Sequence, residues 1–108
     1  MSLQQLFQPR SIAVVGASHT PGKLGHDLLV NVSHGYKGKV YAVNPQGGRI
    51  LGHSVYKAVT EIKKSIDLAI IIVPAAVVCQ SIEEAAKVGV RNFVIISAGF
   101  TESGEQGK

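Results

Sequence analysis

The residues best suited to chemistry lie in a polar turn that begins at Gly16 and interrupts an apolar stretch. Gly16 allows a sharp backbone turn, and Ala17 and Ser18 are small enough to let a phosphate approach the main chain. Thr20 followed by Pro21 is typical of a helix N-cap with proline at the first helical position. Because free N–H groups and the positive end of a helix dipole attract phosphate, we predict a phosphorylated ligand here.

Two further side chains of this turn are candidates for contact with the ligand. Lys23 could add a charge-assisted contact to a phosphate, and His19 lies within the turn itself. The alternative is that Gly16 and Ser18 only form a tight turn, and that His19 is a solvated loop residue.

Two well-known phosphate-loop patterns fit this turn poorly. A Walker A loop needs four residues between its glycines, whereas Gly16 and Gly22 enclose residues 17–21, and Leu24 stands where Ser or Thr is required. The dinucleotide pattern G-x-G-x-x-G fails at Ser18 and at position 21, and the second apolar run ends in Asn44 without an acidic residue for a ribose. We therefore reject an ATPase loop, while an NAD site is disfavoured but stays open.

Apolar, β-branched runs predict the strands that must position this turn, because uninterrupted runs are typical of strands buried on both faces. The expected strands are residues 11–15, 39–43, 67–73 and 92–96, with helices from Pro21 to a left-handed cap at Gly35 and over residues 75–88, which end at Gly89. We expect a glycine-containing loop over residues 46–52 and at most a short helix within 55–62. Strands alternating with helices predict an α/β protein with a Rossmann-like, doubly wound parallel sheet, ordered second, first, third, fourth.

The predicted topology also places the ligand. In open parallel sheets ligands bind outside the carboxyl ends of the strands, near the point where the strand order reverses. That point lies between the first and third strands, so the corners after all four strands should form one rim. The corners are residues 16–18, 43–45, 73–75 and 97–99.

Composition limits the classes of protein and partner. The 108 residues suffice for one domain, and a hydrophobic content of 45% fits a globular chain. Eleven Lys and Arg against 7 Asp and Glu give a net charge of +4, which favours an anionic partner or is ordinary solubility charge. Nucleic acid is a weak fit, because the basic residues form only the pair Lys63 and Lys64 and no aromatic platform is present.

The single cysteine, Cys79, excludes an internal disulfide and favours a reducing, cytoplasmic setting. We expect a buried or half-buried helix thiol there. The first ten residues do not read as a signal peptide, and the longest apolar run, residues 68–79, contains Pro74 and is too short to span a bilayer. We therefore expect no membrane partner.

The sequence predicts neither a metal site nor a catalytic constellation. The four histidines lack the spacing of metal ligands, and no cysteine or carboxylate cluster supports them. Ser18 and Ser97 lie near strand ends, but no Ser-His-Asp order is visible.

At the predicted corners the chain resembles ADP-forming acetyl-CoA and acyl-CoA synthetases. The resembling segments are SIAVVGAS at 11–18, PGKLG at 21–25, GKVYAVNP at 38–45, ILG at 50–52, DLAIIIVPA at 67–75 and SAGF at 97–100. Several segments in the same order are more specific than one glycine motif.

The resemblance implies a Rossmann-like domain that binds coenzyme A, related to the α subunit of succinyl-CoA synthetase. By similarity, residues 18–21 and Lys23 face the pyrophosphate, residues 44–45 and the loop after them face the adenosine with its 3′-phosphate, and the third and fourth corners border the pantetheine arm. The CoA-binding residues so expected are Gly16, Ala17, Ser18, His19, Thr20, Pro21, Lys23, Val43, Asn44, Pro45, Val73, Pro74, Ile96, Ser97 and Ala98.

Two departures from the family pattern affect this expectation. Members often carry a lysine directly after the Asn-Pro pair, where it can meet the 3′-phosphate; here Gln46 stands there, and Arg49 is the nearest cation. The family would also begin another helix and a fifth strand where this chain ends. We therefore expect a single domain over residues 1–108, truncated at its C-terminus and lacking the final strand.

The resembled enzymes convert an acyl-CoA, ADP and phosphate to the acid, ATP and CoA, through an acyl phosphate and a phosphohistidine in another domain. This chain would then hold CoA, ATP and ADP would bind elsewhere in the parent, and the remaining synthetase domains or subunit would be partners. One alternative is a non-catalytic CoA-binding or CoA-sensing module, either stand-alone or fused to a protein acetyltransferase. A fragment of an NAD-dependent enzyme is a further alternative.

Overall fold

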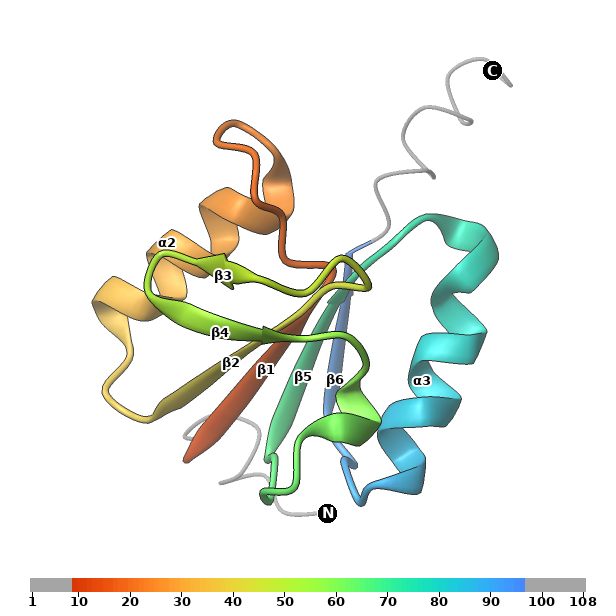
Figure 1. The fold of residues 1–108 in the computed structure, drawn as a ribbon. Coiled ribbons are helices and arrows are strands. Elements are labelled where there is room, and N and C mark those ends of the chain that lie inside the picture. The colour runs from red at the N-terminus through yellow and green to blue at the C-terminus, as the bar shows by residue number, and fades with distance from the viewer. Residues whose placement is uncertain (1–8, 97–108) are drawn as a thin grey trace.

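The computed structural model describes residues 9–96, which form one sheet with a helix on each face (Figure 1). The strands are β1 (Ser11–Val15), β2 (Lys39–Val43), β3 (Arg49–Ile50), β4 (His53–Tyr56), β5 (Leu68–Ile72) and β6 (Phe93–Ile96). The helices are α2 (Leu24–Gly35) and α3 (Val78–Lys87), with short 3-10 turns η1 (Val59–Glu61) and η2 (Ala75–Val77). Within the described residues no helix is long and apolar enough to cross a membrane.

The order of the sheet is β3-β4-β2-β1-β5-β6. The run β2-β1-β5-β6 within it is parallel and confirms the predicted order of the four expected strands. All residues of β1 and β5 are buried, as expected of central strands that are covered on both faces.

The expectation of a plain loop over residues 46–52 is wrong, because this segment contributes to an added β-hairpin. Strands β3 and β4 pair antiparallel, and β4 then pairs parallel with β2, so that Val43 lies opposite Tyr56. Leu51 and Gly52 connect the two strands with φ angles of 53° and 83°. Two consecutive positive φ angles are typical of a type I′ hairpin turn, which usually contains Asn-Gly.

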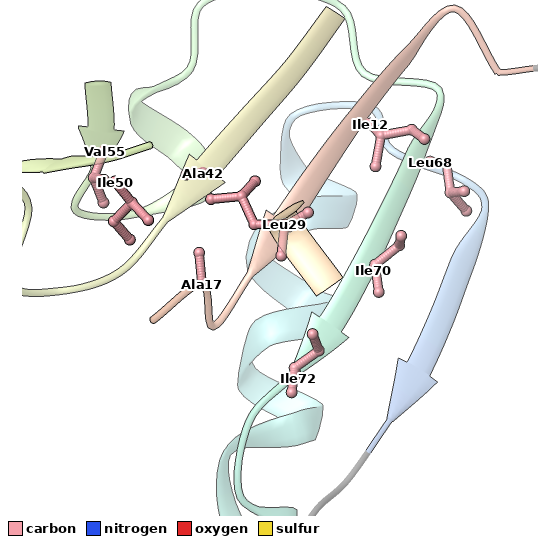
Figure 2. Packing of buried hydrophobic residues seen from close by; sticks show 10 residues of the cluster. Ile12, Ala17, Leu29, Ala42, Ile50, Val55, Leu68, Ile70 and Ile72 are labelled. Carbon is pink, nitrogen blue, oxygen red and sulfur yellow. The ribbon is translucent and has the colours of Figure 1, made fainter. Parts of the chain in front are cut away.

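The core has two parts, one on each face of the sheet. On the α2 face, Leu29 lies in the middle of a cluster formed with side chains of β1, β2 and β5 (Figure 2). On the α3 face, Ala85 packs with Ala13, Ile71 and other buried side chains. This division confirms that the sheet is doubly wound.

The ends of the helices differ in part from those predicted. Helix α2 begins at Leu24 with Lys23 as its N-cap, rather than at Pro21, because Gly22 has a φ of 93° that a right-handed helix excludes. Gly35 is its last helical residue and has no left-handed backbone, since the next residue, Tyr36, is already extended. The predicted end of α3 at Gly89 is confirmed by a φ of 93° there.

Polar contacts join the strands at the amino edge of the sheet. The Ser11 hydroxyl donates to the carbonyl of Ser65 (2.8 Å) and accepts the N–H of Asp67 (3.0 Å). The Asp67 carboxylate accepts the N–H of Arg10 (2.8 Å), and the Asn92 amide donates to the carbonyl of Asp67 (3.0 Å). These groups therefore hold β1, β5 and β6 in register at the edge opposite the predicted rim.

Candidate functional site

The corner after β1 lies close to the ends of the neighbouring strands. Gly16 has a φ of 100°, and a Cβ atom there would lie 1.8 Å from the carbonyl oxygen of Ile72, so only glycine fits. The N–H groups of Gly16 and Ala17 both donate to the carbonyl of Val43, at 2.9 and 3.2 Å. Since these two amides are already used, the N–H groups that remain for a ligand lie after Ala17.

Helix α2 reaches this corner through Gly25, a residue that the sequence-based prediction of the site left out. A Cβ atom at Gly25 would lie 2.1 Å from the carbonyl oxygen of Gly16 and 3.2 Å from the amide nitrogen of Ser18. The first N–H groups of an α-helix have no partner within the helix. The close approach at Gly25 therefore places the first turn of α2 and its positive dipole end directly beside the polar turn.

Asn44, at the end of β2, joins three segments of the rim. Its Nδ2 donates to the carbonyl of Ala17 (2.7 Å), its Oδ1 accepts the N–H of Gln46 (2.7 Å), and its own N–H donates to the carbonyl of Tyr56 (2.9 Å). Both ends of the amide are thus bonded within the protein. Asn44 lies where the resemblance expects the adenosine, but its contacts are those of a residue that positions the surrounding loops.

Two histidines fix the polar turn against its surroundings. Nε2 of His19 donates to the carbonyl of Gly47 (2.8 Å), which links the first corner to the second. Nδ1 of His26 donates to the carbonyl of Ser18 (3.0 Å), which links the turn to α2. A carbonyl oxygen can only accept, so these nitrogens carry the proton in each bond. His19 is exposed but bonded, rather than only solvated.

The remaining predicted site residues lie along the same edge of the sheet. Pro21, Lys23 and Pro74 are exposed, and Thr20 donates its N–H to the Ser18 hydroxyl (3.1 Å). The half-buried Val73 follows β5, whose Ile72 lies opposite Ile96 of β6. The carboxyl ends of β1, β2, β5 and β6 thus lie at one edge (Figure 1). Ser97 and Ala98 lie outside the described residues.

The cations of the rim differ in what they contact. The Arg49 guanidinium donates to the carbonyl of Gly52 (2.8 Å) and to the Ser54 hydroxyl (3.4 Å), so it is turned toward its own hairpin. Lys57, which the sequence did not single out, lies instead against Gly47, with its Cε 3.2 Å from the position of a Cβ there. The position of Lys57 depends on the pairing of β4 with β2, and no motif in the sequence predicts that pairing.

Two further expectations concern metal ligands and the single thiol. Among residues 9–96, no group of three or more histidine, cysteine or acidic side chains is arranged to hold a metal ion. The expectation of a buried or half-buried Cys79 is wrong, because that thiol is exposed. The residues of α3 that pack in the core are Ile82 and Ala85, and Cys79 is not among them. The arrangement is suited to holding a phosphorylated ligand.

Comparison with known protein families bears directly on this rim. The model of the CoA binding domain family matches residues 10–106, which is almost the whole chain. The chain belongs to this family. The predicted resemblance is thereby confirmed, and CoA is the ligand that the family name assigns to this domain.

Related proteins are longer than this CoA-binding domain. It is 49% identical to the alpha subunit of the ADP-forming acetate–CoA ligase I of Pyrococcus furiosus, over 100% of this chain and 24% of that protein. A structure of the dinucleotide forming acetyl-coenzyme A synthetase 1 of Candidatus Korarchaeum cryptofilum, with phosphate and ADP, superposes with a TM-score of 0.86 at 41% identity, over 98% of this chain and 23% of that one. The domain therefore spans about a quarter of these relatives.

A shorter relative is also known. A conserved hypothetical protein from Pyrococcus furiosus superposes with a TM-score of 0.74 at 33% identity. The alignment covers 90% of this chain and 83% of that one, so the same fold also occurs in a chain of similar length.

Proposed function

We propose that this domain holds coenzyme A along its carboxyl rim for an ADP-forming acyl-CoA synthetase, which converts acyl-CoA, ADP and phosphate to the acid, ATP and CoA. The observation that carries the proposal is the double close approach at Gly16 and Gly25, which presses a turn of small residues against the N-terminus of a helix. Such an arrangement favours a pyrophosphate, because free amides and the helix dipole both face it.

The proposed site follows the rim from one side to the other. The pyrophosphate would lie against residues 18–21, the first turn of α2 and Lys23. The adenosine would lie near Pro45, next to the bonded side chain of Asn44. The pantetheine arm would pass Val73 and Pro74 toward Ile96 and the predicted residues 97–98. The domain would bind and orient CoA so that its thiol extends beyond the sheet, while ADP, ATP and the reacting groups are handled elsewhere in the parent.

Edge strand β6 supports a partner for this domain. Val94 is 41% exposed and Ile95 is 44% exposed, and consecutive strand residues point to opposite faces of a sheet. Two exposed apolar side chains on opposite faces of one edge strand are suited to being covered by further protein. We propose that the remaining synthetase domains or subunit pack there, in a cytoplasmic enzyme.

A non-catalytic CoA-binding module is the second candidate. The relative of similar length from Pyrococcus furiosus supports it, because a chain of this size is there a protein in its own right. An NAD-dependent fragment is less well supported, since Asn44 stands at the end of β2 in place of an acidic residue and both ends of its amide are already bonded.

Calorimetric titration of the 108-residue chain with CoA, NAD and ATP tests the proposal. We expect CoA to bind and NAD and ATP to bind far more weakly. Tighter binding of NAD than of CoA would support the fragment of an NAD-dependent enzyme and refute our proposal. Activity of the parent protein then separates the two CoA hypotheses: ATP formed from acetyl-CoA, ADP and phosphate supports the synthetase, and CoA binding without ATP formation supports the module.

A further inference from the structure

The second corner lacks the cation that its ligand requires. In Rossmann-like sheets the end of the second strand lies beside the ribose of the adenosine, and a cation near it accommodates a ribose phosphate. Here that strand is followed by Asn44, Pro45 and the uncharged Gln46. The ribose of CoA carries a 3′-phosphate, so some other side chain must supply the positive charge.

Arg49 is the nearest cation in the sequence, but its geometry does not suit this role. Its Nη2 donates to the carbonyl of Gly52 at 2.8 Å, and its Nη1 lies 3.4 Å from the Ser54 hydroxyl. Both contacts are with its own hairpin. To bind a phosphate at the second corner, the guanidinium would have to give up these bonds.

Lys57 is brought to the second corner by the pairing of β4 with β2. The two strands are parallel, with Val43 opposite Tyr56, so Lys57 follows β4 at the level where Asn44 follows β2. The N–H of Asn44 donates to the carbonyl of Tyr56 (2.9 Å), which fixes the two strand ends together.

The side chain of Lys57 lies over the turn that follows Asn44. A Cβ atom at Gly47 would lie 3.2 Å from Cε of Lys57 and 3.4 Å from its Cγ, so the aliphatic stem packs along this glycine. The ammonium, one bond beyond Cε, is therefore held beside the turn. The same turn is also bonded to His19, whose Nε2 donates to the carbonyl of Gly47 (2.8 Å).

The charge of Lys57 is not neutralised within the described part of the chain. The ion pair found in residues 9–96 joins Arg10 to Asp67 at the opposite edge of the sheet. Glu61 is the acidic residue that contacts Lys57, but its carboxylate accepts the main-chain N–H (3.2 Å) rather than a proton of the ammonium. Lys57 is also exposed, so a ligand can reach it.

We propose that Lys57 binds the 3′-phosphate on the ribose of CoA and thereby lets the domain distinguish CoA from 3′-dephospho-CoA. This inference rests on the proposed binding of CoA at the rim. The stem is positioned by Gly47 and by the β2–β4 pairing, so little side-chain freedom is lost when the ammonium meets the phosphate.

The test compares two ligands that differ only in the 3′-phosphate. CoA and 3′-dephospho-CoA are titrated by calorimetry into the 108-residue chain and into its Lys57→Met, Lys57→Arg and Arg49→Met variants. Methionine keeps an unbranched apolar stem over Gly47 and removes the charge, arginine keeps the charge, and Arg49→Met is the matched control. Circular dichroism establishes that each variant is folded.

We expect the unchanged chain to prefer CoA by about tenfold or more, the usual value of a charge-assisted hydrogen bond. Lys57→Met should lose that preference by weakening CoA alone, with 3′-dephospho-CoA unaffected, whereas Lys57→Arg and Arg49→Met should keep it. The preference should also shrink at higher salt, because the contact is an exposed charge pair.

The outcomes separate this inference from the proposed function. A Lys57→Met chain that still prefers CoA, or an unchanged chain that binds both ligands equally, overturns the role of Lys57 and leaves CoA binding intact. Loss of the preference in Arg49→Met alone transfers the role to Arg49 and overturns the inference. A folded chain that binds neither ligand overturns both the proposed function and the role of Lys57.

Discussion

Replacing Gly25 with alanine tests the close approach of α2 to the polar turn. Gly25 lies in the first turn of the helix and has an ordinary helical backbone, so the substitution introduces no backbone strain. The new Cβ would lie 2.1 Å from the carbonyl oxygen of Gly16. A comfortable contact between carbon and oxygen is about 3.3 Å, so the helix and the turn must separate by more than about 1 Å.

Two opposing terms set the size of the effect. Alanine favours a helix over glycine by about 1 kcal/mol. Overpacking of this kind costs about 1–3 kcal/mol or more, and the upper part of that range applies because the obstructing atom is backbone. Gly16 cannot move aside easily, since its N–H and that of Ala17 are both bonded to Val43. We expect Gly25→Ala to lower the free energy of unfolding by about 1–2 kcal/mol and to weaken CoA binding about tenfold or more.

Gly35→Ala in the same helix is the matched control. A Cβ atom there has nothing within 4 Å, so only the helical preference remains, and we expect the free energy of unfolding to rise by about 0.5 kcal/mol at this terminal position. Urea denaturation followed by circular dichroism measures both variants, and calorimetry measures their binding of CoA. If Gly25→Ala matches Gly35→Ala in stability and in CoA affinity, the close approach does not position the turn and the reasoning is refuted.

Three further predictions concern other parts of the fold. Asn44→Ala removes two side-chain hydrogen bonds of 2.7 Å, so the free energy of unfolding from urea curves should fall by about 1–3 kcal/mol and CoA should bind more weakly. An unchanged stability would contradict the role of Asn44 in positioning the loops. Burial, aided by Asp67, raises the pKa of Tyr36 above its ordinary 10.0. Because the unfolded chain then loses this proton first, stability should fall as the pH rises above about 10. Tyr36→Phe should reduce that fall in denaturation curves recorded above this pH. Val94→Thr on the exposed edge should change the free energy of unfolding by less than about 0.5 kcal/mol while reducing light scattering of the isolated chain, and a larger loss of stability would show that Val94 belongs to the core.

The central part of the sheet could be predicted because its signal is strong and local. Strands β1 and β5 are uninterrupted apolar runs that end at Gly16 and before Pro74, and such runs are typical of buried parallel strands. The order of these four strands follows from two requirements, right-handed connections and helices that cover both faces of the sheet. The carboxyl ends lie at one edge because these strands are all parallel.

The features that the sequence did not reveal depend on special backbone angles or on distant pairing. The β3–β4 hairpin turns at Leu51 and Gly52, and Leu51 has a φ of 53°, which is unusual for this residue type. Leu stands where such turns usually have Asn, so the sequence lacks the Asn-Gly pair that would have predicted the turn. The sequence predicts too early a start for α2, because Thr20 and Pro21 resemble a helix start. The left-handed backbone of Gly22 delays the helix to Leu24. Lys57 reaches the second corner only through the pairing of β4 with β2.

The connection between β1 and β5 has a consequence for the order in which the protein is built. The N–H of Asp67 bonds to the hydroxyl of Ser11, a residue 56 positions earlier in the chain. During synthesis, β1 therefore emerges from the ribosome long before its central neighbour exists, and the sheet cannot close until Leu68–Ile72 has followed. Gly16 adopts its place against Ile72 only at that stage. The contacts of the first two corners with each other can form earlier, so the packing of Gly16 against β5 is the step that completes this part of the rim.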